Sequence, residues 1–316
     1  MNFEDVSRIS RSLCDEVERV IVGKRETVEQ AVLCLLCNGH LLLEDIPGVG
    51  KTTLAKAIAK SIGGEFRRLQ FTPDLLPADI TGSSIFNQKT AEFEFRPGPI
   101  FGNVVLVDEI NRATPKTQSA LLEAMEEHQV TTDGDSRCLP LPFFVLATQN
   151  SIEMTGTYPL PEAQLDRFFM RLSLGYPDRA SEARILAEQR SAHPLESVRE
   201  VISTDELVKV QDQVKQVRVN DLMRDYIVAI IAGTRESSQL VMGSSPRGSL
   251  VLMRAAQACA AARGADYVEP DDVKKVAIPV LAHRVLSRAE VRAKGSNAEN
   301  VIQSIVDHTP APVPVS

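Results

Sequence analysis

The sequence predicts an α/β fold in which helices cover both faces of a parallel β-sheet and a helical domain follows. Three observations support this prediction. Short apolar runs typical of buried strands alternate with helical stretches through the first half of the chain. A glycine-rich loop separates the first of these runs from a helix. Strand signals end near Pro177, and amphipathic helix patterning continues to about Ala289.

The segment before the first strand is predicted to be helical. Val6, Ile9 and Leu13 recur at steps of three and four residues, which places them on one face of a helix. A second helical stretch covers about residues 27–37. Residues 40–43 then form a short apolar run that proline and glycine soon follow, as is typical of a buried parallel strand.

The alternation continues to the end of the first domain. Further strands are predicted at residues 66–71, 104–107, 143–148 and 168–172, and helices at 51–62 and 116–127. Two hairpins interrupt the pattern, one pairing residues 83–86 with 92–95 and the other pairing 129–132 with 137–141. Such alternation implies a three-layer α/β/α arrangement around a parallel sheet.

Composition and charge exclude several classes of protein. The 316 residues are 43% hydrophobic, enough for a sizeable core, and the net charge of -7 provides no diffuse positive field for nucleic acid or an anionic membrane. No apolar run approaches the ~20 residues of a membrane-spanning helix, and the first residues lack the basic-then-apolar order of a signal peptide. We therefore expect a cytoplasmic protein with no membrane span and no nucleic-acid partner.

The 5 cysteines are scattered and odd in number, which is typical of reduced thiols rather than of a disulfide framework. Cys34, Cys37 and His40 are close enough in sequence to suggest a metal site. They lie in or beside an apolar run with no second ligand pair nearby. We therefore favour buried helix packing over metal binding for these three residues.

The strongest functional signal is the glycine-rich loop at residues 44–53, between an apolar strand and a helix. Its glycines let successive backbone N–H groups point at phosphate, Lys51 adds positive charge for the β- and γ-phosphates, and Thr52 can ligate Mg²⁺. Asp45 stands where the strict pattern has glycine, although the phosphate-contacting positions are kept. The alternative, a glycine turn before a surface lysine, leaves the flanking strand and helix unexplained.

Two acidic residues, Asp108 and Glu109, directly follow the apolar run at residues 104–107. In a doubly wound sheet the carboxyl end of a strand is the edge that binds ligands. Asp108 is predicted to hold Mg²⁺ through water, and Glu109 to orient and deprotonate the attacking water. Two acids after an apolar strand are common, but their position after a phosphate-binding loop identifies them as a Walker B motif.

Asn150 follows the predicted strand at 143–148 by way of Gln149. This placement puts a neutral hydrogen-bonding side chain beside the two carboxylates, where it can position the water without adding charge. The alternative is that Asn150 only begins the loop into Ser151.

The order of these motifs resembles that of the MoxR family of AAA+ ATPases. The resemblance rests on the motifs at residues 48–52, 108–113, 147–150 and 160–168. Residues 71–82 are also more similar to that family than to other AAA+ branches. The resemblance covers about residues 20–290 and implies a P-loop NTPase fold of the AAA+ type.

The resemblance implies roles that the residues alone do not define. Asn150 corresponds to sensor 1. Arg167 corresponds to an arginine finger that reaches the nucleotide of the neighbouring subunit, the alternative being a local ion pair with Asp166. Arg247 corresponds to sensor 2, which carries the state of the nucleotide to the lid, the alternative being a solvated arginine at the start of a helix after Pro246.

The resemblance also implies that the cofactors are ATP and Mg²⁺. Phosphate contacts are the same for ATP and GTP, so the preference for adenine rests on the family alone. The predicted catalytic residues are Glu109, Asn150, Arg167 and Arg247, the metal ligands are Thr52 and Asp108, and the nucleotide contacts are Val22, Pro47, Gly48, Val49, Gly50, Lys51, Thr52 and Thr53.

Three regions follow from the resemblance. Residues 1–176 form the AAA+ nucleotide-binding core, in which the first hairpin is the helix 2 insert, the second is the pre-sensor 1 hairpin, and both face the pore of a ring. Residues 177–295 form an all-helical lid. Residues 296–316 are expected to be a flexible tail because the sequence there ends rich in proline.

The implied function is ATP-driven remodelling by a homo-oligomeric ring, expected to be a hexamer. It would help to mature client proteins or insert their cofactors, often with a partner that carries a von Willebrand factor A domain. A nucleic-acid motor like the MCM helicases would use the same motifs, although neither predicted hairpin is basic. A magnesium-chelatase-like ATPase subunit and a slow nucleotide-gated assembly module are also compatible with them.

Overall fold

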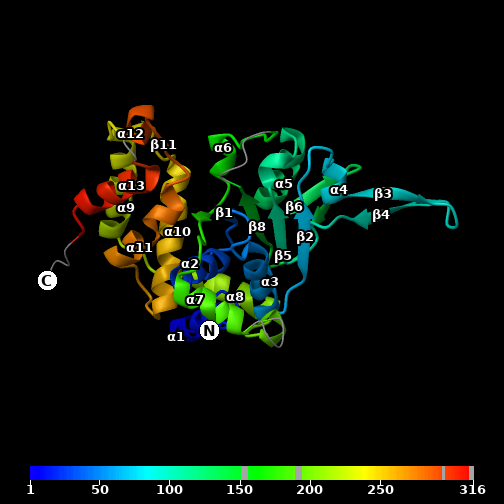
Figure 1. Ribbon diagram of the computed structural model, residues 1–316, viewed down its shortest axis with the longest axis horizontal. Coiled ribbons are helices and arrows are strands. Elements are labelled where there is room, and N and C mark those ends of the chain that lie inside the picture. The colour runs from blue at the N-terminus through cyan, green and yellow to red at the C-terminus, as the bar shows by residue number, and fades with distance from the viewer. Residues whose placement is uncertain (151–155, 189–193, 294–295, 313–316) are drawn as a thin grey trace.

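A parallel sheet forms the centre of the molecule. The computed structural model describes residues 1–150, 156–188, 194–293 and 296–312. The sheet has five strands in the order β2-β5-β8-β1-β9, and every pairing in it is parallel (Figure 1). The strands are β1 (Leu41–Glu44), β2 (Phe66–Gln70), β5 (Val104–Asp108), β8 (Phe144–Gln149) and β9 (Met170–Leu172). The predicted parallel α/β sheet is confirmed.

Both faces of the sheet are buried in hydrophobic clusters. In β5, Val104 and Leu106 belong to one cluster, whereas Val105 and Val107 belong to the other, and all four are fully buried. A strand with two buried faces needs apolar residues at every position rather than at alternate ones. This explains why the sequence of β5 is a continuous apolar run.

Helices cover the two faces of the sheet unequally. The core helices are α1 (Phe3–Glu18), α2 (Arg25–Leu36), α3 (Lys51–Ser61), α4 (Pro77–Thr81), α5 (Pro115–Glu127), α6 (Glu162–Leu165), α7 (Arg179–Glu188) and α8 (Thr204–Val214), with 3-10 turns at Ile110–Arg112 and Pro194–Ser197. The first three pack on one face together with α8, whereas α4 and α5 pack on the other. Local sequence signals start these helices; Asn2 and Asp5, for example, form a capping box at α1.

Both predicted hairpins are present. The first is β3 (Gly82–Asn87) with β4 (Glu92–Pro97), and the second is β6 (Gln129–Thr132) with β7 (Asp135–Cys138). The β3–β4 hairpin projects as an arm beyond the core (Figure 1). The two hairpins touch, because the guanidinium of Arg137 lies 4.1 Å from the centre of the Phe95 ring. Only glycine fits at Gly82, where φ is 91° and a Cβ would lie 2.3 Å from the Arg96 carbonyl oxygen.

A helical lid lies beside the core (Figure 1). Its elements are α9 (Asp221–Glu236), β10 (Leu240–Met242), α10 (Pro246–Arg263), α11 (Pro270–Leu281), β11 (Leu286–Ser287), α12 (Ala289–Ala293) and α13 (Ala298–His308). The lid begins with α9 rather than at residue 177, because α8 packs against α1 and α2 of the core. The expectation that the lid is all-helical is wrong in one detail, because β10 and β11 form a small antiparallel pair. Strands of two and three residues are too short to show a two-residue period in the sequence.

The expected flexible tail is wrong for residues 298–308, which form α13. Asn297 and Asn300 cap the start of this helix. Val301, Ile302 and Val306 are buried, and α13 packs against α9 and α11. The prolines that follow the helix dominate the composition of this segment and conceal the helical spacing of its apolar residues. Residues 313–316 of the predicted tail lie outside the described residues.

Cys34 and His40, two of the three residues for which we favoured packing over metal binding, are buried, and Cys37 is half-buried. All 5 cysteines are free, and burial raises the pKa of Cys14 and Cys259 to about 12. His40 is buried, accepts the backbone N–H of Val145 at 3.1 Å through Nδ1, and places Nε2 3.0 Å from the Met125 carbonyl oxygen. Both ring nitrogens are thus engaged by backbone, and burial lowers the pKa of His40 to about 4. The described residues contain no cluster of metal-ligating side chains.

The helices of the described part of the chain include none that is long and apolar enough to cross a membrane.

Candidate nucleotide-binding and hydrolysis site

The predicted motifs meet around a cavity of about 350 Å³ at the carboxyl edge of the sheet. This edge is where doubly wound sheets bind their ligands. The lining residues are Pro47, Gly48, Gly50, Lys51, Thr52, Thr53, Arg68, Gln70, Asp108, Glu109, Thr148 and Asn150. The phosphate-binding loop, the Walker B pair and the sensor 1 asparagine therefore face one space, although they come from distant parts of the sequence.

The start of α3 provides a backbone cradle for phosphate. Gly50 precedes the helix with φ of 99°, and the helix has no side-chain cap, so its first N–H groups remain available to a ligand. Gly48 also has a positive φ, of 84°, and the space beside its Cα is open. A side chain at either glycine would strain the loop. The local fold therefore fits the phosphates of a nucleotide.

Lys51 brings a half-buried positive charge to the loop. Its Nζ donates to the backbone carbonyl of Asp45 at 2.9 Å. Burial lowers the pKa of Lys51 below its ordinary value, against the opposing effect of the carboxylates of Asp45, Asp108 and Glu109. Because the ammonium group is held by a carbonyl and not paired directly with a carboxylate, its charge is available to phosphate.

Asp45, the departure from the strict loop pattern, has a structural role. Its buried carboxylate accepts the backbone N–H groups of Leu174 and Gly175, the latter at 3.2 Å. These two residues follow β9 and lead into the region before the lid. A glycine at position 45 could not make these bonds, so the aspartate ties the loop to that segment.

Asp108 lies at the end of β5 within a polar network. Its Oδ2 accepts from Arg68 Nε at 2.7 Å, and its Oδ1 accepts from Thr148 Oγ1 at 3.4 Å. Thr52 faces the same cavity from α3. Carboxylate and hydroxyl oxygens are the ligands that Mg²⁺ prefers, so the donor set fits the metal that ATP carries. Thr52 and Asp108 would hold Mg²⁺, which would supply positive charge to the phosphates.

Glu109 is held in an unusual backbone conformation. Its φ is 57°, in the left-handed region, and its N–H donates to Thr148 Oγ1 at 2.9 Å. Its Oε2 accepts from Gln70 Nε2 at 2.9 Å and from Arg112 Nη1 at 3.0 Å. The carboxylate that is predicted to deprotonate water is therefore restrained by two side chains, both through Oε2.

The remaining predicted nucleotide contacts differ in position. Asn150 lines the cavity and is 9% exposed. Val22 and Val49 do not belong to the lining of the cavity. Val22 is buried, and its neighbour Ile21 lies against Gly50, where its Cδ1 would be 3.7 Å from a Cβ at that glycine. Val22, a predicted nucleotide contact, thus lies next to a residue that packs against the phosphate-binding loop.

Arg167 and Arg247 lie outside the cavity, where both bind Glu126 of α5. Arg247 Nη1 is 2.8 Å from Glu126 Oε1, and Arg167 Nη2 is 3.2 Å from Glu126 Oε2. The alternative of a local pair between Arg167 and Asp166 is wrong, because Asp166 is bound instead by Arg284 at 2.7 Å. Arg247 does begin a helix, but it is paired and not merely solvated.

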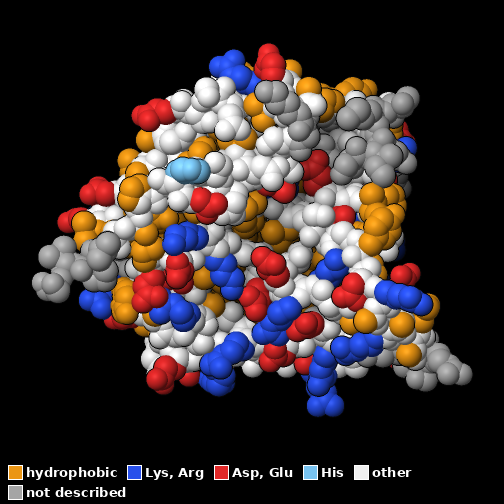
Figure 2. All heavy atoms as spheres, turned by 60° about the vertical axis from the view of Figure 1, so that its left-hand side comes forward, with side chains coloured by type: hydrophobic (Ala, Val, Ile, Leu, Met, Phe, Trp, Pro, Cys, Tyr) orange, Lys and Arg blue, Asp and Glu red, His pale blue; other side chains and the backbone are white. Residues whose placement is uncertain are grey.

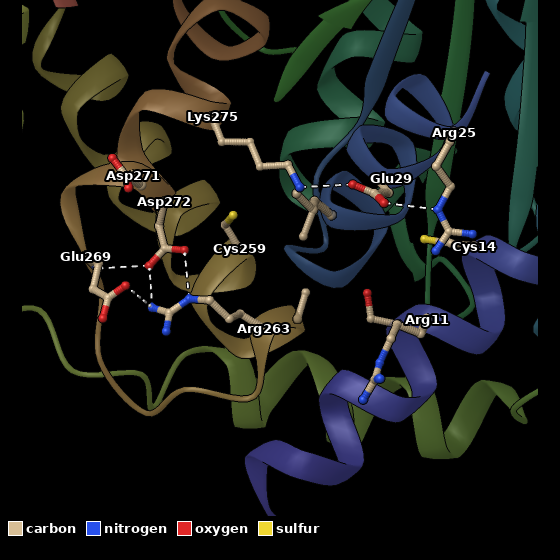
Figure 3. A pocket seen from close by; sticks show the side chains of 13 residues that line it. Arg11, Cys14, Arg25, Glu29, Cys259, Arg263, Glu269, Asp271, Asp272 and Lys275 are labelled. Atoms are coloured by element: carbon tan, nitrogen blue, oxygen red, sulfur yellow. Dashed lines mark hydrogen bonds and ion pairs between the residues drawn. The ribbon is translucent and has the colours of Figure 1, made fainter. Parts of the chain in front are cut away.

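A second cavity, of about 440 Å³, lies between α1 and α2 of the core and α10 and α11 of the lid (Figure 3). Its charged side chains neutralise one another. Lys275 Nζ is 2.9 Å from Glu29 Oε2, Arg25 Nε is 3.0 Å from Glu29 Oε1, and Arg263 Nη2 is 3.0 Å from Asp272 Oδ2. The Lys275–Glu29 pair connects lid and core directly, whereas the Arg25–Glu29 pair lies within the core and the Arg263–Asp272 pair within the lid. The lining of this cavity includes none of the predicted catalytic residues.

A phosphate-binding loop, a Walker B pair and a helical lid on one three-layer α/β domain define an AAA+ ATPase. The family model described as "ATPase family associated with various cellular activities (AAA)" matches residues 40–170, and the AAA lid domain model matches residues 232–305.

Relatives specify the family within this class. Chaperone MoxR1 of Mycobacterium tuberculosis is 42% identical over 306 residues, 94% of this chain and 81% of that protein. YeaC of Bacillus subtilis is 50% identical over 310 residues, 98% of this chain and 97% of that protein. A solved structure from Cytophaga hutchinsonii, assigned as an ATPase, has a TM-score of 0.90 at 36% identity and covers 98% of this chain and 97% of that one. The chain belongs to the MoxR family of AAA+ ATPases, and it hydrolyses ATP.

Proposed function

We propose that this ATPase works as a Mg²⁺-dependent homohexameric ring in the cytoplasm, where it remodels client proteins during their maturation or the insertion of their cofactors. The observation that carries the proposal is the position of Arg167. Its side chain is 31% exposed and is bound to Glu126, outside the cavity of its own subunit. A partly exposed arginine outside the cavity of its own subunit is suited to complete the site of a neighbour, where it would stabilise charge on the γ-phosphate.

Arg247 supports the same arrangement. It comes from the start of α10 in the lid, yet it shares Glu126 with Arg167 and its side chain is 41% exposed. We therefore place both arginines on the face that meets the next subunit. Head-to-tail contacts of this kind close into rings, which gives each interface one nucleotide site.

A dilution series tests the ring. We expect the total rate of ATP hydrolysis to rise more than linearly with protein concentration, as the mass approaches about 208 kDa, six times the 34.6 kDa chain. The measurement is steady-state hydrolysis with mass photometry at each concentration. If the rate stays strictly proportional to concentration down to dilutions at which the protein is monomeric, no neighbouring subunit is needed for hydrolysis. That result would support a slow ATPase that works as a single subunit.

The β3–β4 arm is our candidate contact for clients. Phe93 is 74% exposed and Phe86 is 50% exposed, and their ring centroids are 5.3 Å apart near the tip of the arm. Exposed aromatic side chains on a projecting arm provide an anchor for unfolded apolar segments. A protein with a von Willebrand factor A domain is the partner that we propose would deliver such clients.

Replacing Phe93 by serine tests this contact. We expect the stimulation of hydrolysis by a reduced, carboxymethylated protein that cannot fold to fall by about tenfold, as for the loss of one aromatic anchor. Lys89→Ser, at the exposed turn of the same arm, is the matched control and should keep the stimulation. If the client stimulates both variants and the wild type equally, Phe93 on the arm does not take part in client binding.

The surface charges favour a protein client over nucleic acid. The first hairpin carries Lys89 and Arg96 with Glu92 and Glu94, and the second carries Arg137 with acidic neighbours. On the lid side of the molecule, basic and acidic side chains are intermingled (Figure 2). A phosphate backbone needs a continuous basic track. Salt-sensitive stimulation of hydrolysis by single-stranded DNA would instead support the MCM-like motor, and stimulation only by chelatase partner subunits would support the magnesium-chelatase-like role.

A further inference from the structure

Arg284, at the end of α11, is a buried cation that joins the lid to the segment carrying Arg167. Its side chain is 1% exposed. Its Nε donates to Asp166 Oδ1 at 2.7 Å, and its Nη2 donates to the carbonyl oxygens of Asp166 at 3.1 Å and Phe168 at 2.5 Å. Its Nη1 donates to the carbonyl oxygen of Phe169 at 3.2 Å. One guanidinium group thus holds the backbone on both sides of Arg167.

The segment 166–169 is shared between core and lid. Its N–H groups are bound by the core, since Arg167 N donates to Gln164 O at 3.2 Å and Phe169 N donates to His40 O at 2.8 Å. Its carbonyl groups are bound by the lid through Arg284. Buried backbone groups need such partners, so the segment cannot keep all its hydrogen bonds if the lid turns relative to the core.

The lid contacts this segment at further points. Ser245 Oγ, at the start of α10, donates to Asp166 Oδ2 at 3.2 Å. His283 Nε2 lies 3.0 Å from the Phe168 carbonyl oxygen, and burial keeps the pKa of His283 well below its usual value, so this ring is neutral. Burial lowers the pKa of Arg284 to about 10 while Asp166 opposes the change, so the guanidinium is charged at neutral pH.

We infer that Arg284 is a positioning residue that transmits the orientation of the lid to Arg167, and thereby to the active site of the neighbouring subunit. This inference rests on the proposed function of Arg167. The lid orientation of one subunit would then set whether its neighbour has a complete site. Arg284 itself touches neither nucleotide nor reacting atoms.

The substitution Arg284→Lys tests the inference. Lysine keeps the positive charge beside Asp166, but its single nitrogen cannot replace the guanidinium fork that binds three carbonyl groups of the segment 166–169. We expect kcat to fall about 10- to 100-fold, as for a displacement of a catalytic group by about 1 Å, with KM for ATP within about threefold of wild type. Arg224→Lys is the matched control, because Arg224 is an exposed lid arginine that pairs with Asp221 on its own helix.

Mixed rings separate a positioning role from a structural one. Glu109→Gln subunits cannot hydrolyse ATP but still present Arg167, so they should complete the sites of Arg284→Lys neighbours. In an equimolar mixture half of the subunits are Arg284→Lys, and half of these have a Glu109→Gln neighbour on the required side, so activity should return to about one quarter of the wild-type rate per subunit. A defect confined to the variant's own fold or nucleotide binding would not be restored.

Arg167→Ala subunits mixed with Glu109→Gln subunits distinguish the two hypotheses. If Arg167→Ala is restored and Arg284→Lys is not, the inference about Arg284 is overturned while the trans arginine stands. If neither is restored, the proposed function of Arg167 fails.

If Arg284→Lys does not fold, the variant Asp166→Asn tests the inference in its place, because it weakens the contact between Asp166 and Arg284 without removing the guanidinium. We expect it to show a smaller loss of kcat, of about threefold to tenfold, that Glu109→Gln subunits restore; unchanged kcat would overturn the inference.

Discussion

Replacing Glu109 by glutamine is expected to lower kcat for ATP hydrolysis by about 10²- to 10⁴-fold while the Kd for ATP stays within about threefold. Glutamine has the shape of glutamate and can still accept hydrogen bonds from Gln70 and Arg112, which hold Glu109 Oε2 at 2.9 and 3.0 Å. It has no negative charge with which to take a proton from water. The measurements are steady-state hydrolysis and equilibrium binding of a fluorescent ATP analogue.

Glu236→Gln is the matched control for this experiment. Glu236 is an exposed glutamate at the end of α9, far from the phosphate-binding loop in sequence and absent from the lining of its cavity. Its replacement should leave both kcat and Kd unchanged. If Glu109→Gln hydrolyses ATP as fast as wild type at the same protein concentration, Glu109 is not the general base and the hydrolysis mechanism must use another residue.

The sequence was sufficient to predict the elements that carry the phosphate chemistry. The phosphate-binding loop and the Walker B run are local signals, because each lies within about ten residues and depends on a strand whose burial makes it continuously apolar. Lys51, Asp108 and Glu109 therefore meet in the structure as predicted. The hairpins were also predictable, since each has a polar turn between two short strands.

The residues that sequence reasoning missed are those that only the sheet order brings to the site. Arg68 and Gln70 come from β2, and the pairing of Gln70 with Asp108 places them beside the Walker B acids. Thr148 reaches the same acids from β8 on the other side of β5. The signal for all three is a polar side chain near the carboxyl end of a strand, which becomes informative once the strand order is known.

Long-range ion pairs were equally inaccessible. Asp166 is adjacent to Arg167 in sequence, which suggested a local pair, yet its partner is Arg284, 118 residues away. Glu126 brings Arg167 and Arg247 together from the core and the lid. Nothing in the spacing of these residues indicates such contacts, because they depend on how the lid packs against the core.

The second large effect is expected for Arg167→Ala, which should reduce kcat by about 10³- to 10⁵-fold in assembled protein, as for the loss of an arginine finger. The fold of the subunit should persist, because Arg247 can still bind Glu126, from which it lies 2.8 Å in the wild type. ATP should still bind, since Arg167 does not line the cavity of its own subunit. The measurements are mass, ATP affinity and hydrolysis, each at concentrations that give the wild-type ring.

Arg224→Ala serves as the control for charge, because it removes one exposed arginine from the lid and should leave hydrolysis within about twofold of wild type. The informative comparison is between activity and mass. An Arg167→Ala protein that assembles, binds ATP and does not hydrolyse it places the missing cation in the neighbouring subunit. Equal specific activity of Arg167→Ala and wild type would make Arg167 a structural partner of Glu126, and the main physical reason for catalysis to depend on a ring would be lost.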